Sequence, residues 1–286
     1  MTFLIIFTCI SGCEKDLEVI IPNQPWDLFE HPNAGSLTST TRNAMEGMYV
    51  TQESGDIFGN QVALKWSYAI ESTDTLYQLS LLGEKDVVYF LMQGKRLGDS
   101  ILLKGNWRKM VNTETGAAQL SISYDNGARQ LFSSSPVIAK DSIILQGVYG
   151  EQENAPSKNL SFSYLRPLNS SPFQILAHRA GGRTSDLLPF SENSIGMIRF
   201  APRLGATGVE IDVRMTKDQI PILYHDNTLN LRLIQKNALI GPIENYTYNQ
   251  LDTYVRLIDG QRIPTLRTAL FAILYQTPLT YIWLDT

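Results

Sequence analysis

The segment Gly208-Val209-Glu210-Ile211-Asp212-Val213 alternates apolar and acidic side chains, and this pattern indicates how the second half of the chain folds. Successive side chains of a β-strand point to opposite faces, so Glu210 and Asp212 share one face and the apolar residues share the other. In a parallel barrel the outer face packs on helices, so we expect the carboxylates to point inward. Burying two like charges is costly, and a bound divalent cation is the simplest compensation. Pairing of one carboxylate with a neighbouring arginine is the alternative.

The sequence around this segment alternates strand-like and helix-like patterns. We expect strands at 173–177, 208–213, 220–225 and 279–285, and helices at 194–204 and 266–274. Such alternation indicates a parallel sheet, as in an α/β barrel of the TIM type. A complete barrel of this type needs about 250 residues. We therefore interpret residues 169–286 as its front half, with four strands, and expect the chain to be inactive by itself.

Two histidines stand at the ends of expected strands. His178 ends the first strand and is followed by Arg179, while His225 ends the third and is followed by Asp226. The carboxyl ends of barrel strands converge on one mouth. Histidine has the unperturbed pKa best suited to proton transfer near neutral pH. A histidine pair beside inward carboxylates therefore predicts a catalytic site.

Four short motifs now follow one another in order and spacing. They are His178-Arg179-Ala180-Gly181, Ser191-Glu192-Asn193-Ser194, Glu210-Ile211-Asp212-Val213 and Leu223-Tyr224-His225-Asp226. Together they resemble the glycerophosphodiester phosphodiesterase family over residues 173–286, and Pro264-Thr265-Leu266 fits the later helix start of that family. The match departs at Ala180, where the family has a glycine that lets the backbone approach substrate, and at Ser191, where the family has proline.

The resemblance implies roles for the matching residues. His178 and His225 would form the acid–base pair, and Arg179 would bind the substrate phosphate through its planar guanidinium. Glu192 would support the site from the first turn of a helix. The implied reaction is metal-dependent hydrolysis of glycerophosphodiesters to glycerol 3-phosphate and an alcohol. A phospholipase-type barrel that acts on intact lipid is a rival interpretation.

The resemblance also implies a metal site. Glu210 and Asp212 would hold one divalent cation, and hard oxygen ligands suit Ca²⁺ or Mg²⁺. The family takes a third carboxylate from the end of a later strand. Asp285 occupies the equivalent place in Ile282-Trp283-Leu284-Asp285-Thr286 and is our candidate for the third ligand.

Residues 36–168 show a different pattern, with short strand-like segments separated by turn residues. The expected strands are 47–51, 62–71, 76–82, 87–92, 100–108, 118–124, 142–149 and 160–164. This spacing predicts an antiparallel barrel or sandwich. Gly47-Met48-Tyr49 and Gly105-Asn106-Trp107 loosely resemble lipocalin-like barrels. Aromatic residues of this domain would fill its core or line a cavity for a glycan or lipid. An alternative function is therefore a surface binding module with an inactive barrel.

The first residues form a short apolar run, 3–10, followed by Ser11-Gly12-Cys13. Such a segment is typical of a secretory signal. Its ending resembles a bacterial lipoprotein box, which implies a signal at 1–13, lipidation of Cys13 and a tether at 14–35. The protein would then be a membrane-anchored lipoprotein of the bacterial cell envelope, periplasmic or surface-exposed. A buried N-terminal strand is the alternative.

Composition excludes several classes of protein. The chain is 43% hydrophobic and 18% charged, which can bury a core and is not typical of disorder. Its net charge of -4 argues against a nucleic-acid partner bound mainly through phosphates. Two cysteines exclude a disulfide-dense scaffold.

Overall fold

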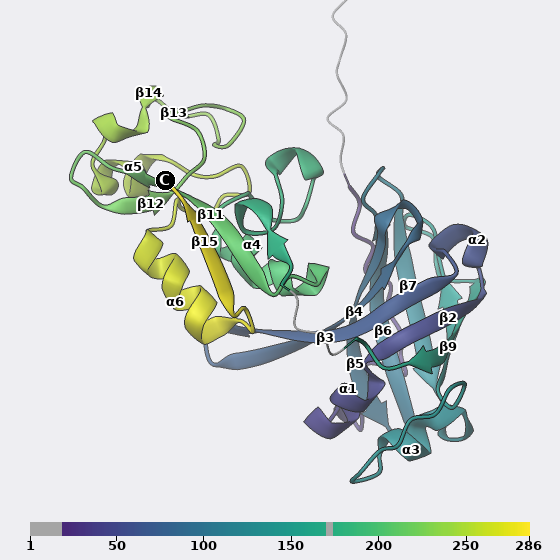
Figure 1. Ribbon diagram of the computed structural model, residues 1–286. Coiled ribbons are helices and arrows are strands. Elements are labelled where there is room, and N and C mark those ends of the chain that lie inside the picture. Colours follow the sequence, from purple (N-terminus) through teal and green to yellow (C-terminus); the bar gives the residue numbers. More distant parts are fainter. Residues whose placement is uncertain (1–18, 170–173) are drawn as a thin grey trace, which may run out of the picture.

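The computed structural model describes residues 19–169 and 174–286. They form an N-terminal β-barrel and a C-terminal α/β region (Figure 1). The predicted lipidation of Cys13 lies outside the described residues and stays a prediction. Within the two described ranges, no helix has the length and apolar character needed to cross a bilayer.

The barrel has eight antiparallel strands, as the sequence predicts. They are β2 (Gly47–Glu53), β3 (Gln61–Glu71), β4 (Asp74–Gly83), β5 (Val88–Leu97), β6 (Ser100–Lys109), β7 (Thr115–Ile122), β8 (Ile144–Tyr149) and β9 (Lys158–Arg166). Each strand pairs with the next, and β9 pairs with β2, so the sheet closes on itself. This closure selects the barrel over the sandwich. A short strand, β1 (Gly35–Ser36), pairs with one end of β5.

The inside of the barrel is packed with alternate side chains of each strand and with Phe58, which lies between β2 and β3. The ring of Phe58 lies 4.9 Å from that of Phe90, 5.2 Å from that of Trp107 and 4.9 Å from that of Tyr149, measured between centroids. Trp66 joins the same core. These two tryptophans therefore fill the barrel and do not face outward.

Short helices cover the ends of the barrel. They are α1 (Ser39–Met45), α2 (Gly55–Phe58), η1 (Lys85–Val87), the π-helical turn η2 (Tyr124–Ala128) and α3 (Arg129–Leu131). The described part of the predicted tether also packs on the barrel. Lys95 Nζ donates a hydrogen bond to the Phe29 carbonyl at 2.8 Å, and Gln24 Nε2 donates to the Glu153 carbonyl at 2.6 Å.

The α/β region is built around β11 (Gly208–Met215), which runs parallel to β10 (Leu176–Ala177) and β15 (Tyr281–Asp285). Its apolar side chains Val209 and Ile211 are fully buried in a cluster with residues of the covering helices. The remaining elements are η3 (His178–Gly181), η4 (Thr184–Asp186), α4 (Ile195–Phe200), η5 (Ala201–Leu204), β12 (Pro221–Leu223), β13 (Thr228–Leu229), β14 (Gly241–Pro242), η6 (Ile243–Asn245), α5 (Tyr248–Tyr254) and α6 (Leu266–Gln276). The predicted partial α/β architecture is confirmed.

The predicted third barrel strand at 220–225 is wrong. Its ordered part, β12, pairs with β11 in the antiparallel direction, with Val213 opposite Leu223. Only residues 216–220 connect the two strands, whereas a crossover between parallel strands needs about a dozen residues. Three parallel strands are therefore present in residues 174–286, and β12 is the return arm of a hairpin.

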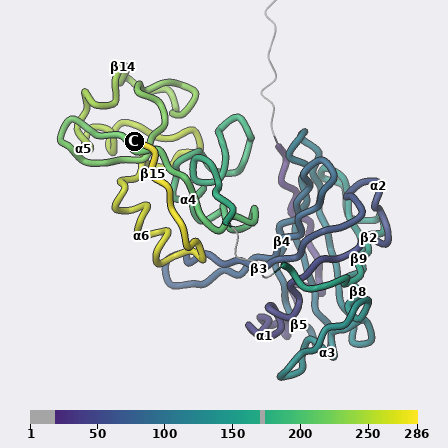
Figure 2. The backbone as a smooth tube through the Cα atoms, in the orientation of Figure 1, coloured from purple at the N-terminus to yellow at the C-terminus, as the bar shows by residue number. Residues whose placement is uncertain are grey.

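The barrel and the α/β region meet through polar contacts. The β3–β4 hairpin reaches out of the barrel toward α6 (Figures 1 and 2), where Tyr68 Oη donates to the Thr277 carbonyl at 3.5 Å. Ser80 Oγ donates to the Arg203 carbonyl at 2.7 Å. Arg108 donates from two guanidinium nitrogens to the carbonyls of Leu187 at 2.6 Å and Asp186 at 2.8 Å.

Replacing Phe58 with alanine tests the aromatic core. Phe58→Ala removes a fully buried ring that contacts three other rings, so we expect the free energy of unfolding to fall by about 3–5 kcal/mol. Chemical denaturation followed by near-UV circular dichroism measures the change. Val137→Ala is the control, because Val137 is 84% exposed and such changes stay within about 0.5 kcal/mol. Equal losses in both variants would contradict this packing.

Candidate active site

Three carboxylates meet at the ends of neighbouring strands. Glu210 and Asp212 lie on one face of β11 and are 9% and 6% exposed. The parallel register of β11 and β15 places Asp212 opposite Asp285. One ligand oxygen from each carboxylate lies within 4.8 Å of the other two. The structure thus gathers the three residues that the sequence proposes as metal ligands.

The carboxylates are poorly compensated by protein charges. Burial raises the pKa of Glu210, and the negative charges of Asp212 and Asp285 add to that effect, while a hydrogen bond from the Arg179 backbone N–H at 2.6 Å opposes it. No lysine or arginine of the described residues forms an ion pair with Glu210 or Asp212, because the Arg179 guanidinium pairs with Glu192 instead. The arginine-pairing alternative is therefore not what the structure shows. The donor set fits a hard divalent cation.

Asn193 fixes the position of Asp212 and was not singled out from the sequence. Its Nδ2 donates to Asp212 Oδ2 at 2.6 Å, and its Oδ1 accepts from the Asp212 backbone N–H at 3.1 Å. Asn193 is buried and has a φ of 56°, a left-handed conformation that asparagine tolerates better than most residues. The only signal in the sequence is its place in the Ser191–Ser194 motif.

Arg179 and His225 are in direct contact. Arg179 Nη2 lies 2.7 Å from His225 Nε2, and His225 Nδ1 lies 2.6 Å from Asp226 Oδ1. A guanidinium only donates, so Nε2 must accept and the ring proton sits on Nδ1, where it is donated to Asp226. This network therefore selects a neutral His225 with its lone pair directed at Arg179. The Nε of Arg179 is buried without a hydrogen-bond partner.

His225 reaches this position through the β11–β12 hairpin and not as the end of a barrel strand. The hairpin extends past the end of the parallel strands and then returns, and the Tyr224 backbone N–H donates to the Asp212 carbonyl at 3.0 Å. His225 is thereby brought back beside the carboxylates. We expected His225 at the end of a parallel barrel strand, and it instead follows an antiparallel strand that returns to the site.

Asp226 and Arg232 complete the network and were not predicted as site residues. Arg232 Nη2 donates to Asp226 Oδ1 at 2.6 Å. Burial acts to raise the pKa of Asp226, but hydrogen bonds from Arg232, His225 and Asn230 outweigh it and hold that pKa well below its usual range. Asp226 could have been found from its position directly after His225, whereas nothing local marks Arg232.

Glu192 joins the two arginines of the site. It is 2% exposed and accepts from Arg179 Nη1 at 2.9 Å, from Arg232 Nη1 at 3.1 Å and from the Thr184 backbone N–H at 2.8 Å. We expected Glu192 to lie in the first turn of a helix, and this expectation was wrong. α4 has Ser194 as its N-cap, so Glu192 precedes the helix in the connecting loop.

His178 is exposed and adjacent to Arg179, and its side chain makes no hydrogen bond to any residue described in 19–169 or 174–286. It lies close enough that its positive charge, when present, lowers the pKa values of Glu210 and Asp186. Ala180, two residues after His178, is fully buried and has a φ of 68°. This conformation costs a non-glycine residue about 1–2 kcal/mol, so the departure from glycine at Ala180 places strain beside the site.

Residues 178–277 match the model of the Glycerophosphoryl diester phosphodiesterase family. These residues form a domain of that family. The β-barrel lies outside the match.

Several curated proteins are similar to this chain in sequence. The chain is 27% identical to a glycerophosphocholine phosphodiesterase of Rattus norvegicus over 278 residues, which covers 91% of this chain and 38% of the relative. It is 34% identical to the Homo sapiens glycerophosphocholine phosphodiesterase over 258 residues, covering 85% and 36%. A glycerophosphodiester phosphodiesterase of Rattus norvegicus is 44% identical over 104 residues, covering 33% and 28%. The chain thus spans less than two-fifths of the length of these relatives.

Solved structures include a glycerophosphodiester phosphodiesterase from Parabacteroides distasonis, with 30% identity, 39% of this chain and 40% of that chain covered, and a TM-score of 0.30. A phosphodiesterase from Oleispira antarctica, solved with its product sn-glycerol-3-phosphate, has 29% identity, covers 35% and 39%, and has a TM-score of 0.29.

Replacing Glu210 with glutamine tests the charge balance of the site. Because the folded-state pKa of Glu210 is raised, its charged form destabilises the fold above that pKa, and the penalty vanishes as pH falls below the unfolded value near 4.5. In the absence of divalent cations, Glu210→Gln should therefore raise the melting temperature at pH 7 and raise it less at pH 4.

Differential scanning calorimetry at both pH values measures this difference, and adding Ca²⁺ or Mg²⁺ should stabilise the wild type more than the variant. Glu153→Gln is the control, since Glu153 is an exposed glutamate on the barrel. A lower melting temperature for Glu210→Gln at pH 7 would refute the charge argument.

Proposed function

We propose that the site hydrolyses glycerophosphodiesters to glycerol 3-phosphate and an alcohol. The observation that carries this proposal is the meeting of three carboxylates, one ligand oxygen of each within 4.8 Å of the others, beside the Arg179–His225 contact in a domain of the phosphodiesterase family. If these carboxylates served only the stability of the fold, we would expect lysine or arginine side chains to pair with them, because uncompensated buried charges are costly.

Glu210, Asp212 and Asp285 would hold the divalent cation, Ca²⁺ or Mg²⁺. When bound, the cation would neutralise phosphate charge and polarise its oxygens. Arg179 supplies the second positive group. Its Nε is buried and unpartnered, so it can donate to a phosphate oxygen without breaking an existing hydrogen bond.

The two histidines divide the proton transfers. The Asp226 carboxylate holds the ring proton of His225 on Nδ1, so Nε2 carries the lone pair of a general base. That lone pair accepts from Arg179 Nη2, and it would take the proton from the attacking hydroxyl when Arg179 turns to the phosphate. His178 is exposed and has no hydrogen-bond partner among the described residues, so it is free to approach the leaving oxygen and return a proton to it. Glu192 keeps Arg179 and Arg232 in place during both steps.

Histidine variants test the assignment directly. In protein made from the full reading frame, His178→Ala and His225→Ala should each lower kcat on glycerophosphocholine by about 10²–10⁴-fold, the usual contribution of a general acid or base. His31→Ala is a matched control, because His31 is the one other histidine of the chain and lies exposed in the N-terminal segment.

The same assay discriminates the rivals. We expect a chelator to abolish turnover and intact phosphatidylcholine to be a poor substrate. Metal-independent turnover, or full activity in His178→Ala, would overturn the mechanism. Faster turnover of the intact lipid would favour a phospholipase.

Asn193 offers a test that needs no turnover. Asn193→Gly keeps the left-handed backbone but removes both side-chain hydrogen bonds to Asp212, so divalent-cation affinity should fall by about 10–100-fold. Isothermal titration calorimetry of the 286-residue chain with Ca²⁺ and Mg²⁺ measures it. Asn159→Gly, on the barrel surface, should bind like wild type, and unchanged affinity in Asn193→Gly would remove Asn193 from the site.

A further inference from the structure

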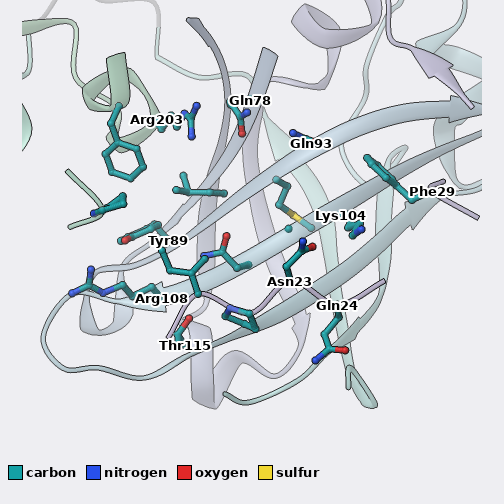
Figure 3. A pocket seen from close by; sticks show the side chains of 18 of the residues that line it. Asn23, Gln24, Phe29, Gln78, Tyr89, Gln93, Lys104, Arg108, Thr115 and Arg203 are labelled. Carbon is teal, nitrogen blue, oxygen red and sulfur yellow. The ribbon is translucent and has the colours of Figure 1, made fainter. Parts of the chain in front are cut away.

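A second pocket lies where the barrel meets the family domain. Its volume is about 540 Å³, within the range of small-molecule sites. It is lined by the N-terminal segment, by the outer faces of β4, β5 and β6, and by residues of the α/β region such as Phe190 and Arg203 (Figure 3). It is separate from the candidate active site, none of whose carboxylates or histidines line it.

Arg108 brings an unpaired positive charge to this pocket. It extends from the outer face of β6, is 4% exposed, and donates to the backbone carbonyls of Asp186 and Leu187. It also lies close enough to the Tyr89 hydroxyl to oppose the rise in the pKa of Tyr89 that burial causes. Its Nε is buried and has no partner, and no carboxylate of the described residues forms an ion pair with it. Buried charges are normally paired, so an anion is the missing group.

Arg203 brings a second such charge. Its Nε is also buried without a partner, and burial lowers its pKa against the attraction of Glu71, which is too distant for an ion pair. Lys104 lines the pocket too, but Glu30 neutralises it at 2.9 Å. Two guanidiniums on one cavity therefore form no ion pair with any carboxylate of the described residues.

The rest of the lining is suited to hydroxyl groups. Gln78, Gln93 and Asn106 supply amide donors and acceptors from neighbouring strands, and Tyr89 lies across from Arg108 on the paired strand. Figure 3 shows Gln78 near Arg203, and Tyr89 near Arg108. Amide groups match the alternating donors and acceptors of a polyol, and aromatic rings such as that of Phe200 pack against its C–H faces.

We propose that this pocket binds a small phosphorylated polyol, such as a sugar phosphate, with its phosphate on the side of the pocket that Arg108 and Arg203 line and its hydroxyls on the amide side chains. The geometry also connects the pocket to the active site. Arg108 holds the carbonyls of Asp186 and Leu187, and in the same loop the Thr184 N–H donates to Glu192 at 2.8 Å. Occupancy of the pocket would therefore fix the loop that supports Glu192.

Calorimetric titration of the 286-residue chain with glucose 6-phosphate, glucose and inorganic phosphate tests the proposal. We expect glucose 6-phosphate to bind more tightly than either fragment. Arg203→Gln should weaken it by about tenfold or more, the value of one charge-assisted hydrogen bond. Arg203 makes no side-chain hydrogen bond to any described residue, so this variant should fold, and Arg108→Gln serves as the second variant.

Two arginine controls locate the site. Arg179→Gln removes the phosphate-binding group proposed for the active site, and Arg129→Gln removes an exposed arginine of α3; both should keep wild-type affinity. Binding should also slow amide hydrogen exchange in residues 183–188. Absence of binding, equal affinity in Arg203→Gln, loss of binding in Arg179→Gln, equal affinity for inorganic phosphate, or unchanged exchange in this loop would overturn the proposal. None of these measurements depends on turnover.

Discussion

The pairing of β11 with β15 is the constraint on which the site depends. The parallel register places Asp212 opposite Asp285 and leaves Glu210 on the same face, so a shift of one residue would turn one strand's carboxylates into the apolar layer. Burial of Val209 and Ile211 under the helices prevents such a shift. Hydrophobic packing on one face thus holds three repelling carboxylates together on the other.

The acidic residues of the site differ in whether a positively charged side chain pairs with them. Glu192 and Asp226 are each held by arginines, and the pKa of Asp226 is correspondingly low. Glu210 has no such partner, and its pKa is raised. The acids that orient Arg179 and His225 are therefore neutralised by arginines, and the acids of β11 and β15 are not. This division matches the proposed roles, in which the first group positions side chains and the second would hold a divalent cation.

The barrel contributes to the family domain through its outer face. Ser80 and Arg108 both point away from the barrel core and donate to carbonyls of the α/β region. Those contacts fix η5 and the loop before Glu192, which lie far from the barrel in the sequence. The same face carries the cationic pocket, so support of the loop and binding of an anion would share the Arg108 side chain.

Local patterns of side chains were sufficient to predict the elements that depend on near neighbours in the chain. Alternation over 208–213 gave the strand and its acidic face, and turn residues between apolar segments marked the eight barrel strands. The short connection 216–220 also contained the evidence against a parallel third strand, although we expected one. His178, Arg179 and His225 could be identified because each belongs to a short motif that is visible in the sequence.

The contacts between groups that are distant in the chain could not be predicted, because they depend on how the elements pack in space. Closure of the barrel depends on β9 pairing with β2, and the contacts of Asn193 with Asp212 and of Arg232 with Glu192 join segments on different elements. Nothing in the local pattern of these residues specifies their partners, because hydrogen bonds and ion pairs depend on distance in space. In the sequence, Arg108 is an ordinary outward-facing residue of a strand. Its charge is unusual only because the α/β region buries it.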